Sequence, residues 1–152
     1  MKKAEHVTIV IFGASGDLTK RKLIPALFQL AKDGLLTEKT TIVGFARRKK
    51  SHEQFRVEIE DALVEFSRSK PEAGSRELKV FSSCCYYQTG NYDSTKNFHD
   101  LKELIDKLDE ERGIDSGKAN RLFYLSTPPN VFSGIVAMLG QEIGRASCRE
   151  RV

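Results

Sequence analysis

Residues 7–34, VTIVIFGASGDLTKRKLIPALFQLAKDG, join an apolar run to an amphipathic segment through a short turn that contains two glycines. The run from Val7 to Phe12 has the length and β-branched composition of a buried strand, and it stops at Gly13. From Leu18 onward the apolar residues recur at helical spacing, and lysine and arginine occupy the other side. The stretch therefore predicts a strand, a tight turn and a helix.

The glycine turn has the features of a phosphate site. The first turn of a helix leaves backbone N–H groups unpaired and carries a partial positive charge, so an anion binds there when no side chain blocks it. Gly13 and Gly16 remove such side chains. Ser15 and Thr19 supply hydroxyl donors, and Asp17 is placed to cap the helix. The turn lacks both the G-x-G-x-x-G spacing and the P-loop lysine, so an ordinary capped turn stays open on spacing alone.

The composition is that of an ordinary soluble chain one domain long or less, with 152 residues, 39% of them hydrophobic and 30% charged. The apolar run at residues 7–12 is too short for a membrane span or a signal peptide. Three cysteines, two of them adjacent as Cys84 and Cys85, give neither a disulfide framework nor metal-ligand spacing. We therefore expect a cytoplasmic protein with no membrane association and no metal site.

The net charge of +4 would ordinarily suggest a nucleic-acid partner. The last ten residues, 143–152, hold three arginines and one glutamate, so they supply a net +2 of this charge. The surrounding string EIGRASCRERV resembles the translation of a common sequencing-adapter oligonucleotide, although a natural basic tail is the alternative. We expect no nucleic-acid partner, a non-native tail over 142–152, and a natural protein that continues past about Gln141.

The rest of the chain alternates strand and helix patterns. Further strands are predicted over 40–46, 78–86 and 121–126, and further helices over 52–69, about 94–110 and 131–140. This order predicts an α/β, Rossmann-like parallel sheet with alternating helices, in a dinucleotide-binding domain that is incomplete. Ligands bind such sheets beyond the carboxyl ends of the strands. The segments expected to line that crevice are 13–20, 46–49, 90–93 and 126–130.

The end of the second predicted strand indicates which dinucleotide binds. NAD-specific domains of this kind place an acidic residue there, but this strand runs into Arg47 and then Arg48, Lys49 and Lys50. A guanidinium donates a fork of hydrogen bonds to a 2′-phosphate, so Arg47, with Arg48 as a second candidate, favours NADP. A solvated basic loop is the alternative, and Lys49 and Lys50 are expected at the surface. The three histidines show no partner pattern and are expected to be structural or exposed: His6, His52 and His99.

Four motifs follow one another over about residues 6–140: IFGASGDLTKRKLIPALFQL, IVGFAR, GNYD and NRLFYLSTPPNVF. In this order they resemble the signatures of the glucose-6-phosphate dehydrogenase family. The resemblance implies an enzyme that oxidises glucose 6-phosphate to 6-phosphogluconolactone with NADP in the pentose phosphate pathway, and that forms a homo-oligomer.

The resemblance also assigns binding roles. The turn would hold the cofactor's diphosphate, through Gly13, Ala14, Ser15, Gly16, Asp17, Leu18, Thr19 and Lys20. Arg47 would hold the adenosine 2′-phosphate, and Tyr92 and Asp93 would lie against the cofactor. Spacing alone also allows Asp93 to cap the following helix. Phe132, after the double proline, would lie near the nicotinamide.

Two family segments are missing from this sequence: the E-K-P-F-G lysine segment and the H-Y-L-G-K histidine segment of the second α+β domain. No catalytic residue is therefore assigned. The expected product is an N-terminal cofactor-binding fragment, residues 1–141, that lacks the substrate domain and is inactive by itself. The alternatives are another Rossmann NADP-binding oxidoreductase and a non-catalytic nucleotide-binding module.

Overall fold

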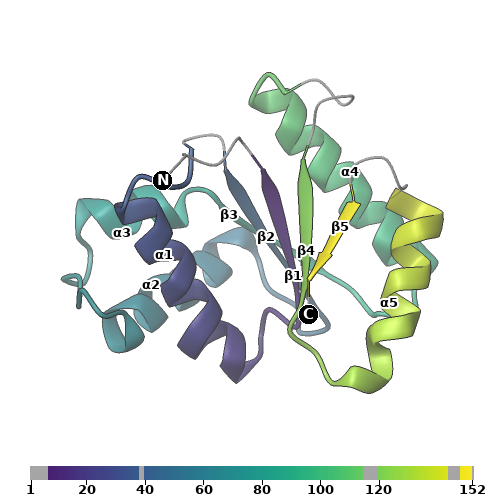
Figure 1. Ribbon diagram of the computed structural model, residues 1–152, viewed down its shortest axis with the longest axis horizontal. Helices are drawn as coiled ribbons and strands as arrows, with labels where there is room; N and C mark the ends of the chain where they lie inside the picture. The colour runs from purple at the N-terminus through teal and green to yellow at the C-terminus, as the bar shows by residue number, and fades with distance from the viewer. Residues whose placement is uncertain (1–6, 38–39, 115–119, 144–147, 152) are drawn as a thin grey trace.

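The first predicted strand lies at the centre of a parallel sheet. The computed structural model describes residues 7–37, 40–114, 120–143 and 148–151. Strand β1 (Thr8–Phe12) pairs with β2 (Thr41–Ala46) on one side and β4 (Arg121–Leu125) on the other. The outer strands are β3 (Cys85–Thr89) and β5 (Cys148–Arg151), so the order is β3-β2-β1-β4-β5 (Figure 1). The predicted α/β, Rossmann-like architecture is confirmed.

Helices cover both faces of the sheet (Figure 1). One face carries a π-helical turn η1 (Thr19–Leu23) that continues into α1 (Ile24–Lys32), then α2 (His52–Phe66) and α3 (Arg76–Ser82). The other carries α4 (Thr95–Glu111), the short turn η3 (Pro129–Val131), α5 (Phe132–Met138) and a second π-helical turn η4 (Leu139–Ile143).

Strand β1 alternates between two hydrophobic clusters, as a strand buried on both faces must. Ile9 and Ile11 pack in the cluster under α1, α2 and α3. Val10 and Phe12 pack in the cluster under α4 and α5. Every residue of β1 and β2 is buried, so packing on both faces fixes the positions of the carboxyl ends of these strands.

The prediction of a strand over 78–86 is wrong in its first half. Residues Arg76–Ser82 form α3, and the strand begins only at Cys85. Leu78 and Phe81 lie three residues apart, which puts both on one helical face, and both are buried. Of the two adjacent cysteines, Cys84 lies in the turn before the strand and Cys85 is buried at its start.

The sheet also holds a strand that the sequence did not predict. β5 lies in the segment assigned to a non-native tail and pairs in parallel with β4. Over the described ranges the sheet therefore has five strands rather than the four predicted. The origin of the tail stays a prediction.

The two histidines in the described part of the chain have local roles. The Nδ1 atom of His52 accepts a hydrogen bond from the Tyr87 backbone N–H at 2.9 Å, and burial lowers the pKa of this imidazole. His99 is exposed, 3.2 Å from Glu103. His6 lies outside the described residues.

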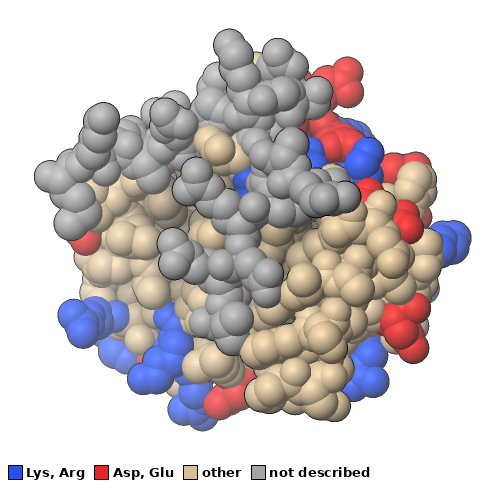
Figure 2. Space-filling view, turned by 45° about the vertical axis from the view of Figure 1, so that its right-hand side comes forward, with Lys and Arg blue, Asp and Glu red and all other residues tan. Residues whose placement is uncertain are grey.

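Surface features of the described residues bear on the function. None of the described helices combines the length and the apolar composition that crossing a membrane requires. Within the same ranges no three His, Cys, Asp or Glu side chains gather as metal ligands would. Helix α5 contains no charged residue, and Figure 2 shows an uncharged area on the side of the molecule where α5 lies.

Candidate functional site

The candidate site lies where the strand order reverses. β2 follows β1 on one side of the sheet and β4 lies on the other, which is the arrangement that opens a crevice beyond the carboxyl ends of the strands. The register places Phe12 beside Phe45 and Leu125, so the chain leaves all three strands at one level. The segments predicted to line the crevice lie at the carboxyl ends of β1, β2, β3 and β4 in turn: 13–20, 46–49, 90–93 and 126–130.

Gly13 is the point of closest contact between the turn and β4. Its φ is +86°, and a Cβ built there would lie 2.1 Å from the Ser126 carbonyl oxygen. Its N–H donates to the Phe45 carbonyl at 3.0 Å, while Ser126 N–H donates to the Phe12 carbonyl at 2.8 Å. The buried Thr19 hydroxyl lies 3.1 Å from the Gly13 carbonyl oxygen and 3.2 Å from Ser126 Oγ. Thr19 therefore fixes the turn to β4, and its predicted role as a free hydroxyl donor is wrong.

Gly16 directly precedes the helical segment, and no side chain covers the backbone on its outer side. Its N–H donates to the Gly13 carbonyl at 2.9 Å, and a Cβ built on it would meet only that oxygen, at 3.1 Å. The N–H groups that follow in the first turn have no acceptor within the helix. The prediction that Asp17 caps this helix is wrong, because Asp17 lies inside the helical segment, whose start has no side-chain cap. Its carboxylate accepts from Arg21 Nε at 2.9 Å instead. Asp17 and Leu18 are both exposed beside the bare backbone.

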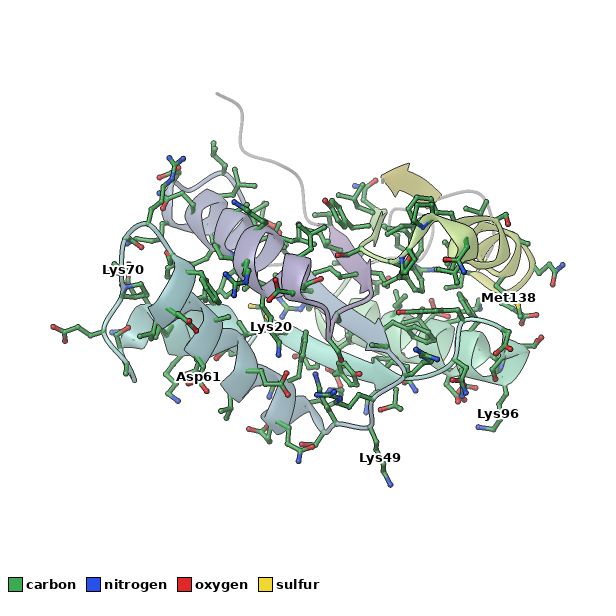
Figure 3. All side chains as sticks on the ribbon, turned by 90° about the horizontal axis from the view of Figure 1, so that it is seen from below. Lys20, Lys49, Asp61, Lys70, Lys96 and Met138 are labelled. Carbon is green, nitrogen blue, oxygen red and sulfur yellow. The ribbon has the colours of Figure 1, made fainter. Side chains whose placement is uncertain are left out.

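A buried lysine lies behind the turn. The Lys50 side chain is only 4% exposed, so its predicted surface position is wrong, whereas Lys49 points outward from its loop (Figure 3). Lys50 Nζ donates to Glu58 Oε1 at 2.8 Å and to Ser15 Oγ at 3.0 Å. Lys20, which lies between α1 and α2 in Figure 3, places its Nζ 3.2 Å from the same Glu58 oxygen. Burial alone would raise the pKa of Glu58. The ammonium groups of Lys50 and Lys20 have a larger opposite effect, so the pKa lies below its ordinary value and the carboxylate stays ionised.

Arg47 and Tyr92 lie at the exits of β2 and β3. Arg47 directly follows β2 and is exposed, and it has no ion pair within the described residues. The Tyr92 ring is partly buried, with its centroid 6.4 Å from that of Phe12 and 5.9 Å from that of Phe45. Burial raises the pKa of the Tyr92 hydroxyl, and the Gly13 backbone and the Arg47 guanidinium oppose that shift. Tyr92, Arg47 and the glycine turn are therefore brought together.

Two other predicted residues have limited roles in this geometry. Ala14 is 1% exposed and its methyl group faces Gly44, so only its backbone is available. Asp93 is exposed, and it does not cap α4. The cap is Ser94, whose hydroxyl accepts from the Asn97 N–H at 3.2 Å.

The exit of β4 supplies a polar group without a partner. Thr127 Oγ1 is buried and has no hydrogen-bond partner among the described residues, and its methyl carbon would lie 3.1 Å from a Cβ built on Gly13. Phe132, expected near the nicotinamide, is partly buried and packs against the cluster under α4 and α5. An unsatisfied hydroxyl beside the turn is a feature that a bound polar ligand would complete.

Comparison with known proteins assigns this geometry to a family. A family model described as "Glucose-6-phosphate dehydrogenase, NAD binding domain" matches residues 10–152. The chain belongs to the glucose-6-phosphate dehydrogenase family. It is 44% identical over 133 residues to glucose-6-phosphate 1-dehydrogenase of Chlamydia muridarum, covering 88% of this chain and 25% of that protein. It is 38% identical over 150 residues to the Kluyveromyces lactis enzyme, covering 97% of this chain and 29% of that one.

A solved structure of the family gives the same result. Glucose-6-phosphate dehydrogenase in complex with its substrate glucose-6-phosphate superimposes with a TM-score of 0.82 at 35% identity, covering all of this chain and 30% of that one. The chain spans about a quarter of the length of the curated relatives it matches. A nicotinamide dinucleotide is the cofactor that the matching domain of glucose-6-phosphate dehydrogenase indicates.

The described residues fit such a cofactor on three independent points. Gly16 leaves the backbone bare where a diphosphate would approach. Thr127 Oγ1 is an orphaned hydroxyl next to that turn. Arg47 is an exposed cation at the end of β2, where an acidic side chain would repel a 2′-phosphate.

Sequence reasoning missed the groups behind the turn, namely Lys50, Glu58 and Tyr87. One signal was available: Glu58 lies three residues after Phe55 and four before Ala62, both buried, so it borders the apolar face of α2. A carboxylate at that border needs a cation, and the nearest basic run in the sequence is 47–50. Nothing in the sequence showed that Lys50 is the residue that turns inward.

Proposed function

We propose that this chain is the NADP-binding part of a glucose-6-phosphate dehydrogenase that oxidises glucose 6-phosphate to 6-phosphogluconolactone in the pentose phosphate pathway. The observation that carries the proposal is the convergence of a bare glycine turn, an orphaned Thr127 hydroxyl and the exposed Arg47 at one edge of the sheet. The relatives bear the enzyme's name, and one solved relative is titled as a complex with its substrate glucose-6-phosphate.

The turn, Arg47, Tyr92 and Asp93 each have a binding role in this proposal. The backbone N–H groups from Gly13 to Lys20 hold the diphosphate. Arg47 pairs with the adenosine 2′-phosphate, and Tyr92 and Asp93 lie along the cofactor. When bound, the nicotinamide accepts a hydride, and the protein supplies orientation and electrostatics. No residue of this chain is assigned to proton transfer.

The first prediction tests the cofactor assignment through Arg47→Asp. Hydrogen bonds to charged groups contribute about 1.5–3 kcal/mol, so this variant should lose about 10- to 100-fold of the preference for NADP over NAD. The measurement is calorimetric titration of both dinucleotides, with adenosine 2′,5′-bisphosphate and 5′-AMP as shorter probes.

The matched control is Lys49→Asp, which makes the same charge change at an exposed side chain two residues away. It should lower the preference by far less. Equal losses in the two variants would mean that the loop attracts phosphate only through its net charge, and the assignment of Arg47 would be wrong.

Two expectations about the whole protein stay predictions: that it forms a homo-oligomer and that it is cytoplasmic. Cross-linking at graded protein concentration tests the first, and localisation of a tagged full-length protein tests the second.

A further inference from the structure

A series of polar contacts connects the glycine turn to the loop that carries Arg47, and Tyr87 of β3 is its centre. The Tyr87 hydroxyl donates to the Arg48 carbonyl oxygen, with 2.6 Å between the oxygens, and lies 3.3 Å from the Ala46 carbonyl oxygen. It also lies 3.5 Å from Ser15 Oγ, which in turn is 3.0 Å from Lys50 Nζ.

Only one direction of hydrogen-bond donation along this series is consistent with the protons available. An ammonium group only donates, so the Ser15 oxygen accepts from Lys50 and its own proton is available to the Tyr87 oxygen. A phenol has one proton, and the short contact to Arg48 shows where that proton lies. The chain of donation therefore runs from Lys50 through Ser15 and Tyr87 to the Arg48 carbonyl.

The two carbonyls that Tyr87 contacts belong to the residues on either side of Arg47. Arg47 itself is exposed and has no ion pair among the described residues. The Tyr87 proton holds the carbonyl of Arg48 after it, while the Ala46 carbonyl before it accepts from the Gly90 N–H at 2.9 Å. The Tyr87 ring is held in turn, because it is 4% exposed, its centroid is 5.1 Å from that of Phe55, and Lys50 Nζ lies 5.3 Å from it. Burial raises the pKa of the Tyr87 phenol, so it keeps its donor proton at neutral pH.

We propose that Tyr87 is a positioning residue that sets the selectivity of this site for a 2′-phosphorylated adenine dinucleotide, by holding the Arg48 carbonyl directly after Arg47. This inference rests on the proposed function, since it requires Arg47 to bind the 2′-phosphate. Holding Arg47 in one backbone arrangement reduces the entropy lost when its fork of donors pairs with a phosphate.

The test is Tyr87→Phe, which removes the hydroxyl and keeps the ring against Phe55. The loss of one intramolecular hydrogen bond should weaken NADP binding about 3- to 10-fold and leave NAD binding within about 2-fold. The control is Tyr86→Phe on the same strand, whose ring lies 5.3 Å from that of His52 and whose hydroxyl has no hydrogen bond among the described residues. It should change neither affinity.

A double variant separates positioning from general stability. In an Arg47→Ala background, Tyr87→Phe should leave the NADP-to-NAD ratio unchanged, because Tyr87 acts through Arg47. A further fall of the ratio in that background overturns the proposal, as does an equal loss of both affinities in the single variant.

A second variant covers the case in which Tyr87→Phe does not fold. Ser15→Ala then replaces it, since any direct contact of Ser15 with the diphosphate is common to both dinucleotides and cancels in the NADP-to-NAD affinity ratio. The ratio should again fall, and an unchanged ratio overturns the proposal. If Arg47→Asp abolishes the preference and Tyr87→Phe does not alter it, only this inference fails. If the unaltered chain binds no NADP, or Arg47→Asp has no effect, the proposed function fails as well.

Discussion

The sheet carries a charged cluster at each end, and the two clusters differ in what surrounds them. At the amino ends of the strands, Arg121 Nη2 lies 2.5 Å from Asp106 Oδ1 and 3.2 Å from Asp109 Oδ2, and Thr8 donates to Asp109 at 3.2 Å. The Arg121–Asp109 pair makes the centre of this amino-end cluster closed, since both side chains are 6% exposed, while Asp106 at its edge is 43% exposed. It joins α4 to β1 and β4.

The carboxyl-end cluster of Lys50, Glu58 and Lys20 is open on one side. Lys50 is buried, but the Glu58 and Lys20 side chains are 32% and 36% exposed, and the polar contacts continue to Ser15 in the turn. The comparison shows that two clusters of similar charge have different roles at the two edges of the sheet. The closed cluster secures the packing of α4, and the open cluster supports a surface that a ligand can reach.

The largest effect on stability should come from opening the amino-end cluster with Arg121→Met. The change leaves the buried Asp109 carboxylate without its cation, which costs about 3–5 kcal/mol when one partner of a buried pair is removed. Urea unfolding measures the loss, and the NADP-to-NAD affinity ratio of the folded protein should not change.

The control for this variant is Lys102→Met, which removes an ion pair with the same Asp106 at 3.2 Å but from a side chain that is 40% exposed. It should cost at most about 1 kcal/mol. Similar losses in the two variants would show that burial does not distinguish the clusters in the way the structure indicates.

The next largest effect should come from Gly13→Ala at the carboxyl end. A positive φ costs an L-residue about 1–2 kcal/mol and overpacking costs about 1–3 kcal/mol more, so the total is about 2–5 kcal/mol. Dinucleotide binding should be lost with it, because the Cβ would displace the Ser126 backbone and the turn together.

Gly34→Ala is the matched glycine for comparison. Its φ is +73°, but nothing lies within 4 Å of a built Cβ, so only the backbone term of about 1–2 kcal/mol applies. Thermal unfolding and NADP titration of both variants give the comparison. If Gly13→Ala is no more destabilising than Gly34→Ala, the contact with β4 does not constrain the turn.

The sequence predicted those parts of the fold in which one periodicity is clear. The run at β1 and the helical spacing after Leu18 differ sharply, so the strand, turn and helix were predicted and are confirmed. Residues 78–82 were ambiguous, because Leu78 and Phe81 suit a short helix while Leu78, Val80 and Ser82 alternate as in a strand.

The site was predictable where it depends on backbone and not where it depends on side-chain direction. The glycine turn and Arg47 follow strand ends, and the topology alone brings strand ends together. Lys49 and Lys50 have the same charge and are adjacent, yet one is exposed and the other is buried against Glu58. That difference depends on tertiary packing between β3, α2 and the turn, which a single sequence does not encode in any local pattern.

The smallest effect should come from Glu58→Gln in the carboxyl-end cluster. Because the Glu58 side chain is 32% exposed, water screens its pairs with Lys50 and Lys20, and the loss should be about 1 kcal/mol at pH 7. The lowered pKa of this carboxyl makes its contribution depend on pH. The difference between wild type and variant should be full above the unfolded pKa of 4.5 and should disappear as pH falls through the lower folded value.

The control is Asp61→Asn on the same helix, whose side chain is exposed (Figure 3). Its effect should be near zero at both pH 7 and pH 3, as measured by urea unfolding. A loss for Glu58→Gln as large as that for Arg121→Met would mean that the carboxyl-end cluster is as closed as the amino-end one. In that case Lys50 would act mainly on the packing of α2, and its contact with Ser15 would be a by-product of that packing rather than a support for the ligand surface.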